Sequence, residues 1–186
     1  LAYDTRPVVA EQVESLGGKF LKIDIGETGQ TKDGYAKELT DEQKAKQQEA
    51  QRDAIADSDI VITTAQLFGR KPPVLISKDT LALMKPGSVV VDMAATSGGN
   101  VEGSVAGETV EVNGVKVIGN GYWSQYVAKA ATDMYANNIY NLVDEFFDDE
   151  TKTFGLNLED DILAGCVITH DGSITNDMLN NAYKGA

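Results

Sequence analysis

Apolar positions along the chain switch between two periods, and this alternation predicts an α/β fold. Residues 8–16 have apolar side chains at helical spacing and end at two glycines, whereas residues 19–25 alternate like a strand. Residues 59–65 and 89–94 are nearly continuous apolar runs, as expected for parallel strands buried on both faces. Residues 114–119 begin at an Asn-Gly turn signal and form a third candidate. Strands separated by helices at this spacing predict a doubly wound parallel sheet.

The connections between these strands carry helix and loop signals. Thr40 can cap a polar helix over residues 41–56, with Gln43 completing a capping box. Ser77 can cap a short helix that ends near Met84. Residues 26–34 are rich in Gly, Thr and Asp and have no apolar anchor, which indicates an exposed loop.

The pattern changes after residue 119. Residues 128–147 form a long amphipathic helix, and two short strands over residues 154–158 and 162–169 precede a polar tail. We therefore expect two parts, residues 1–128 with the sheet and residues 129–186 belonging to a neighbouring domain.

Composition narrows the possible partners. Lys and Arg number 16 and Asp and Glu 29, giving a formal charge of −13 that opposes nucleic-acid binding. No apolar run reaches the roughly 20 residues that cross a bilayer. Cys166 is the single cysteine and lies in an apolar run, so we expect a buried, inert thiol. His170 is the single histidine, and we expect no metal site.

The first residues carry the most informative chemistry. An apolar stretch ending at Asp4 and leading into a helix is typical of the second strand of a dinucleotide-binding unit, whose carboxylate binds the ribose hydroxyls and disfavours a 2′-phosphate. The alternative is an acid that stabilises the N-terminus of the helix. Arg6 could accept a 2′-phosphate or pair with an acid. The matching Gly-x-Gly-x-x-Gly turn belongs about 20 residues upstream, so we expect the chain to be the later part of a longer protein.

The strand ends predict where a ligand lies. Residues 63–65 and 92–95 lead into segments rich in small side chains, and ligands of open α/β sheets bind at the carboxyl ends of strands. Tight loop packing is the alternative. Tyr35, on a polar loop, is either an exposed side chain or part of a lid. We expect the acidic residues 144–150 to be a solvated helix end.

Several of these segments together resemble the soluble NAD(H)-binding domain of proton-translocating NAD(P) transhydrogenase, within the alanine dehydrogenase superfamily. The segments that carry the resemblance span nearly the whole chain: residues 4–7, 11–20, 34–38, 59–65, 84–94, 98–100, 114–119, 158–160 and 169–172.

The resemblance implies a fold, an activity and partners. The fold is a Rossmann-like doubly wound parallel sheet that lacks its first βα unit, followed by a helix and short strands that return to the first domain of the parent. NADH bound here passes hydride to NADP(H) on a separate domain, coupled to proton translocation through a membrane domain. The family implies a homodimer and a soluble domain on the cytoplasmic face of an inner-membrane complex.

The resemblance also assigns residues. Asp4, Thr5 and Arg6 line the adenosine ribose and adenine, and no catalytic acid or base is implied. The remaining implied cofactor contacts are Gly34 and Tyr35 in a lid, Gln47, and the strand-end residues Thr64, Ala65 and Gln66. Gln66 departs from the family, which has an apolar residue there, and residues 67–73 and 120–125 also differ from its usual loops.

Two other interpretations stay open. The chain could belong to an alanine dehydrogenase, or it could be a noncatalytic dimerisation or scaffold module built on the helix at residues 128–147. Under the transhydrogenase interpretation, we expect this chain alone to bind NAD poorly and to be inactive, because the Gly-rich loop lies outside it.

Overall fold

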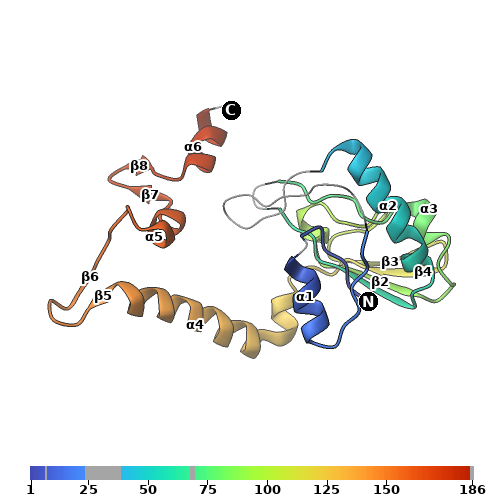
Figure 1. The fold of residues 1–186 in the computed structure, drawn as a ribbon, viewed down its shortest axis with the longest axis horizontal. Helices are drawn as coiled ribbons and strands as arrows, with labels where there is room; N and C mark the ends of the chain where they lie inside the picture. The colour runs from blue at the N-terminus through green and yellow to red at the C-terminus, as the bar shows by residue number, and fades with distance from the viewer. Residues whose placement is uncertain (7, 24–38, 68–69, 185–186) are drawn as a thin grey trace. The chain divides into compact units, whose positions relative to one another are not determined.

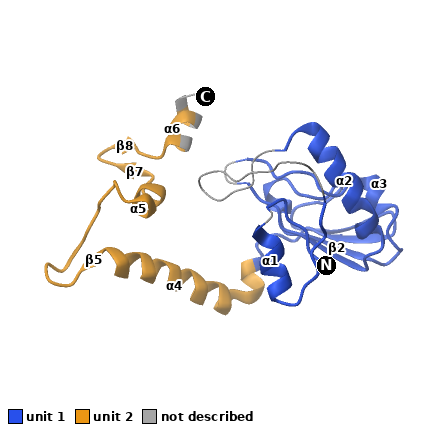
Figure 2. Ribbon diagram, in the orientation of Figure 1, with its two compact units in different colours: residues 1–123 blue, residues 124–186 orange. Residues whose placement is uncertain are grey.

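The computed structural model describes residues 1–6, 8–23, 39–67 and 70–184. The predicted lid residues Gly34 and Tyr35 lie outside these ranges. The chain divides into two compact units, residues 1–123 and 124–186 (Figure 2). The predicted boundary between residues 128 and 129 lies at the start of α4 (Ala128–Phe146) and stays a prediction.

A four-stranded sheet organises the first unit (Figure 1). Its order is β1-β2-β4-β3, and the strands are β1 (Ile60–Thr63), β2 (Val89–Asp92), β3 (Thr109–Val112) and β4 (Val115–Ile118). β1, β2 and β4 are parallel, which confirms the three predicted strands and the parallel α/β sheet. Their carboxyl ends therefore meet at one edge.

β3 is an element that the apolar pattern did not predict. It pairs antiparallel with β4 through a hairpin whose turn residues Asn113 and Gly114 have φ of 52° and 79°. Two successive positive φ values are those of a type I′ turn, for which Asn-Gly is the preferred sequence. The Asn-Gly signal was used to predict only the strand after the turn, and the structure shows that it joins two strands.

The core of the first unit packs on one part of this sheet. α3 (Lys78–Leu81) begins at the N-cap Ser77, as predicted. The buried core consists of Ile76, Leu81, Met84, Val90, Val101, Val115 and Val117.

The prediction that β1 is buried on both faces is wrong. Val61 packs against the core, but Ile60 and Ile62 are 68% and 60% exposed. β1 is the edge strand of the sheet, and no described element covers the face that carries these two isoleucines. A continuous apolar run shows that a strand can be buried on both faces, but it does not show whether another element covers each face.

The N-terminal segment forms a second, smaller pairing. Ala2 pairs in parallel with Phe20, and among the described residues this bridge alone represents the strands predicted at residues 1–4 and 19–25, of which 24 and 25 are not described. α1 (Val8–Ser15) connects the two segments and ends at Gly17, whose φ is +79°. The rings of Tyr3 and Phe20 stack with centroids 6.3 Å apart.

These pairings fit the strand order of a doubly wound sheet, 3-2-1-4-5-6. Phe20 and Ala2 correspond to positions 3 and 2, and β1, β2 and β4 correspond to positions 4, 5 and 6. No strand among the described residues takes position 1, which separates the two sets in this order. Each set therefore forms its own ladder.

α2 (Asp41–Ala56) begins as predicted. The Gln43 backbone N–H donates to Thr40 Oγ1 over 3.2 Å, and the Thr40 N–H donates to Gln43 Oε1 over 3.0 Å. This capping box fixes the first turn of α2. The helix α2 contacts α3.

The second unit consists of a long helix followed by short elements. The elements after α4 are β5 (Phe147–Asp148), β6 (Thr153–Phe154), α5 (Asp161–Cys166), β7 (Thr169–His170), β8 (Ser173–Ile174) and α6 (Asp177–Lys184), and the 3₁₀ helices of the chain are η1 (Ala95–Ser97) and η2 (Trp123–Val127). No helix among the described residues is long and apolar enough to cross a membrane.

Three predictions about the second unit are wrong. The strand predicted over residues 162–169 is mostly α5, because Asp160 Oδ1 accepts hydrogen bonds from the N–H groups of Ile162 and Leu163 and starts a helix. Cys166 is exposed rather than buried, since Leu163 is the residue of this short helix that is buried. The end of the chain forms α6 where a polar tail was expected.

Candidate functional site

Asp4 lies between the Ala2 bridge and α1, as the second strand of a dinucleotide-binding unit requires. Its carboxylate is bound by Arg6 from both the side chain and the backbone. Oδ1 accepts from Arg6 N over 2.8 Å and from Nε over 3.0 Å, and Oδ2 accepts from Nη2 over 3.0 Å. Of the alternatives open for Arg6, the structure shows pairing with an acid, and the acid is Asp4 itself.

This pairing keeps the Asp4 carboxylate ionised. Burial acts on Asp4 most strongly and favours the neutral acid, but the hydrogen bonds and charge of Arg6 together outweigh it and lower the pKa of Asp4. Burial and the Asp4 charge raise the pKa of the adjacent Tyr3 to about 12. The Asp4 side chain is 28% exposed, so an ionised acceptor is accessible from outside.

The loops after β1 and β2 are joined at the carboxyl edge of the sheet. Met93 N–H donates to the Thr63 carbonyl over 3.0 Å, and Gln66 Nε2 donates to the Met93 carbonyl over 3.3 Å. Thr64, Ala65 and Gln66 therefore run alongside the turn after β2. The structure brings these three predicted contacts together at one edge.

Asp92, at the end of β2, organises the turn that follows. It is fully buried, and its two oxygens accept backbone hydrogen bonds from Ala94, Asn100 and Val101 over 3.0 to 3.2 Å. A buried carboxylate is stable when its lone pairs are used in this way. Asp92 thus fixes the turn at residues 94–101 to the sheet.

Glycines allow the loops at this edge to approach closely. A Cβ on Gly119 would lie 2.5 Å from the Val105 carbonyl oxygen, and a Cβ on Gly121 would lie 2.3 Å from Thr96 Cγ2. The edge is thus lined by small residues and backbone, which is the surface that a nucleotide-binding crevice uses.

Gln47 lies on α2 and is 7% exposed. Its neighbour Gln48 donates from Nε2 to the Val74 carbonyl over 3.3 Å, so α2 lies against the chain that leads into α3. Gln51 is buried on the same helix, which its polar sequence did not predict.

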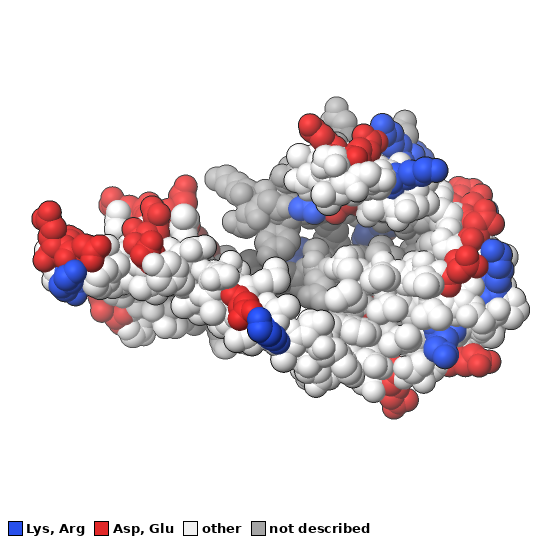
Figure 3. All heavy atoms as spheres, turned by 90° about the horizontal axis from the view of Figure 1, so that it is seen from below, with Lys and Arg blue, Asp and Glu red and all other residues white. Residues whose placement is uncertain are grey.

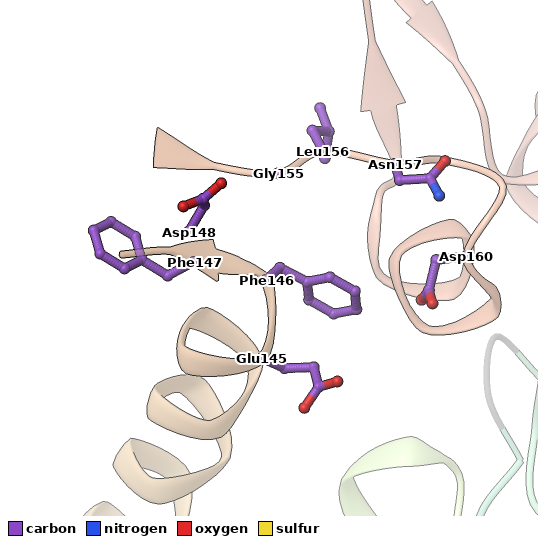
Figure 4. Close-up of a pocket in the computed structure, with 8 residues that line it drawn as sticks. All are labelled: Glu145, Phe146, Phe147, Asp148, Gly155, Leu156, Asn157 and Asp160. Carbon is purple, nitrogen blue, oxygen red and sulfur yellow. The ribbon is translucent and has the colours of Figure 1, made fainter. Parts of the chain in front are cut away.

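A separate open hollow lies in the second unit, at the end of α4 (Figure 4). In Figure 4 the Phe146 ring and the Glu145 side chain point to the side of Asp160, and Phe147 points the other way. Its lining residues are Glu145, Phe146, Phe147, Asp148, Gly155, Leu156, Asn157 and Asp160.

Two of the three acids that line this hollow already serve local structure. Asp160 caps α5, and Asp148 Oδ1 accepts from the N–H groups of Glu150 and Thr151, which lower the pKa of Asp148. No group of three His, Cys, Asp or Glu side chains that could hold a metal ion occurs in the described part of the chain. Figure 3 shows acidic side chains gathered at this end of the second unit. The strand-end loops are thus the better candidate site.

A family model described as "Alanine dehydrogenase/PNT, C-terminal domain" matches residues 1–177. The chain belongs to the alanine dehydrogenase/PNT family. This confirms the resemblance found in the sequence, and the family's solved members share the fold described above.

Relatives in this family include the NAD(P) transhydrogenase subunit alpha of Haemophilus influenzae, which is 39% identical over 172 residues, covering 92% of this chain and 34% of that protein. The crystal structure of transhydrogenase from Sinorhizobium meliloti matches with a TM-score of 0.69 at 37% identity, covering 93% of this chain and 44% of that one. An L-alanine dehydrogenase structure matches with a TM-score of 0.63 at 22% identity and covers 98% and 45%, which shows the fold alone. The chain thus spans less than half the length of each of these proteins.

Proposed function

We propose that this chain is the NAD(H)-binding part of an NAD(P) transhydrogenase, which passes hydride from NADH to NADP(H) on a separate domain. In the parent complex this transfer is coupled to proton translocation through a membrane domain, and the present chain lies on the cytoplasmic face. The observation that carries the proposal is the ionised, accessible Asp4 carboxylate at the second-strand position of a chain whose relatives carry this name.

The residues at the candidate site fit a dinucleotide. Asp4 offers acceptor oxygens for the adenosine ribose, and Thr5 and Arg6 flank it. Thr64, Ala65 and Gln66 lie at the carboxyl edge that takes the second half of a dinucleotide in a doubly wound sheet. Gln47, Gly34 and Tyr35 remain proposed contacts. When bound, the nicotinamide ring supplies the hydride.

The chain's own part in this reaction is positioning. Asp4 orients the adenosine ribose and disfavours a 2′-phosphate through its charge. Arg6 holds that carboxylate ionised and in one orientation. The joined strand-end loops hold the other half and exclude water, so no acid or base from this chain is required.

Binding tests the assignment directly. NADH titration, followed by nucleotide fluorescence, compares the chain, the full-length gene product and its Asp4→Ala variant. We expect the full-length product to bind, the chain alone to bind poorly, and Asp4→Ala to weaken NADH binding about tenfold, the loss of a charge-assisted hydrogen bond. Asp59→Ala is the matched control, since Asp59 is an exposed acid that pairs with Lys85 before β1. Equal NADH affinity for wild type and Asp4→Ala contradicts the proposal.

Alanine dehydrogenase is the second enzyme candidate, since the matching family model is named for both enzymes. Assaying the full-length product for hydride exchange between nicotinamides and for oxidative deamination of alanine separates the two. We expect the exchange reaction. Deamination without exchange shows instead that the chain belongs to an alanine dehydrogenase.

A noncatalytic scaffold is the remaining candidate, favoured by the exposed apolar side chains of α4. In that case the full-length product binds no nucleotide in the titration and catalyses neither reaction.

A further inference from the structure

Asn100 fastens the segment after β1 at several points. Its Nδ2 donates to the Ala65 carbonyl over 2.9 Å and to the Pro73 carbonyl over 2.8 Å. Its own carbonyl accepts from Leu75 N over 2.7 Å and from Ile76 N over 3.1 Å. One residue thus holds both ends of the connection that leaves β1 and enters α3.

Asn100 is itself held rigidly. It is fully buried, and its N–H donates to both oxygens of Asp92, over 3.2 and 3.0 Å. Asp92 also binds Ala94 and Val101 N–H groups. Asp92, at the end of β2, therefore holds Asn100 in place, and Asn100 in turn holds the Ala65 carbonyl.

The side-chain chemistry of Asn100 is asymmetric. Both N–H groups of the amide are used, whereas Oδ1 is buried with no hydrogen-bond partner in the structure's described part. A buried acceptor without a partner lowers stability. The Oδ1 atom therefore lowers stability, whereas the Nδ2 atom donates two hydrogen bonds. Only an amide of this size supplies both donors at this site.

We propose that Asn100 is a positioning residue for the nicotinamide half of the bound dinucleotide, acting through Ala65. This inference rests on the proposed function. Asp4 lies in the half of the doubly wound sheet that binds the adenosine side, whereas Ala65 follows β1, in the half that binds the other nucleotide. Loss of the Asn100 donors moves Ala65 and Gln66 and leaves the Asp4 end in place.

Two ligands separate these halves. NADH uses both, and 5′-AMP uses the adenosine half alone, so we compare the affinity of the full-length gene product for NADH by fluorescence titration and for AMP by competition. Asn100→Asp keeps the side-chain shape and removes the NH₂ group, so that at most one donor, the O–H of the protonated acid, is left for the two carbonyls. We expect it to weaken NADH binding about tenfold and to leave AMP binding unchanged.

Asn113→Asp is the matched control. Asn113 Nδ2 also donates to a backbone carbonyl, that of Lys78 over 3.2 Å, but Asn113 is exposed and lies in the hairpin turn at the opposite end of β4. Asn100→Ser provides a second variant if Asn100→Asp fails to fold, because its smaller side chain leaves room for water to bind the two carbonyls. We expect Asn100→Ser to weaken NADH binding selectively as well, by a smaller factor.

The outcomes are distinct. Equal weakening of NADH and AMP binding indicates general destabilisation and overturns the inference. Unchanged NADH binding in Asn100→Asp or in its substitute Asn100→Ser also overturns it, while the proposed function stands. A wild-type product that binds neither ligand overturns the proposed function, and the inference falls with it.

Discussion

At the scale of single residues, Asp4 and Arg6 form a preorganised unit. The two residues are separated by Thr5 alone, yet both carboxylate oxygens of Asp4 are engaged by Arg6. Because the guanidinium favours the ionised acid, the carboxylate charge, which we propose selects against a 2′-phosphate, is present before any ligand binds. Under the proposed function, Arg6 supports a preference for NAD(H) by keeping Asp4 ionised, although Arg in isolation suggests NADP(H).

The lowered pKa of Asp4 predicts a pH-dependent contribution to stability. Since the folded pKa lies below the unfolded value, the contribution is fully present above the ordinary pKa of about 3.9 and is lost as pH falls through the folded pKa. We expect Asp4→Asn to lower the free energy of unfolding by about 1 kcal/mol at pH 7, the upper range for an exposed pair. Urea unfolding from pH 7 to pH 2 measures the difference.

In that series the wild type and Asp4→Asn converge below the ordinary aspartate pKa. Asp59→Asn is the control, because no comparable interaction surrounds Asp59 in the described structure apart from its exposed Lys85 pair. A difference that stays constant to pH 2 contradicts the pairing in solution.

The sequence predicted the position of Asp4 but could not predict its geometry. A strand-end acid before a helix is a local pattern, whereas pairing with Arg6 depends on how the turn places the side chain. Asn100 is a stronger example, because its partners Ala65 and Pro73 lie far from it in the sequence. Only the assembled sheet brings them together.

Among the elements, the loops after β2 and β4 approach so closely that they limit which side chains can stand at these strand ends. Gly121 has φ of +66°, and a Cβ there would meet Thr96 Cγ2. The loop after β4 and the turn after β2 therefore share one space. A side chain on either loop displaces the other.

We expect Gly121→Ala to destabilise the protein by about 2 to 4 kcal/mol, because positive φ costs about 1 kcal/mol and overpacking about 1 to 3 kcal/mol. Adding Thr96→Ala removes the clashing methyl group. We expect it to recover the part of the stability loss that comes from overpacking and to leave the part that comes from positive φ. Urea unfolding of the single and double variants measures both. Additive losses in the double variant contradict the close contact.

Element prediction succeeded where the signal is local and failed where it is not. Runs of β-branched residues predicted β1 and β2, the Asn-Gly turn signal predicted β4, and Thr40 and Ser77 correctly marked helix starts. Residues 162–169 contain an apolar run that suits a strand or a short helix, and Asp160 as N-cap decides for the helix. No described element covers one face of β1, and the local apolar pattern carries no signal for that exposure.

At the scale of the whole molecule, the second unit exposes much of its apolar surface. Met134, Tyr135, Ile139, Tyr140 and Val143 on α4 are all at least 45% exposed. Seen from below, few charged side chains lie along this helix (Figure 3). Such a contiguous surface favours association.

We expect the purified chain to self-associate, with a light-scattering mass above 19.9 kDa that rises with concentration. Ile139→Glu should reduce the association, because it places a charge within the apolar surface. Asn137→Glu adds the same charge on the other side of the helix and serves as the control. A monomeric wild-type chain at every concentration contradicts this expectation.

The position between Ala2 and β1 in the strand order bears on how the two halves of the sheet are connected. A strand placed there would donate and accept backbone hydrogen bonds toward both the Ala2 segment and β1, and would become the ladder that joins the adenosine-side half to the nicotinamide-side half. Rigid spacing between the two ends of an extended ligand would then be set by main-chain geometry, with the side chains of either half free to vary.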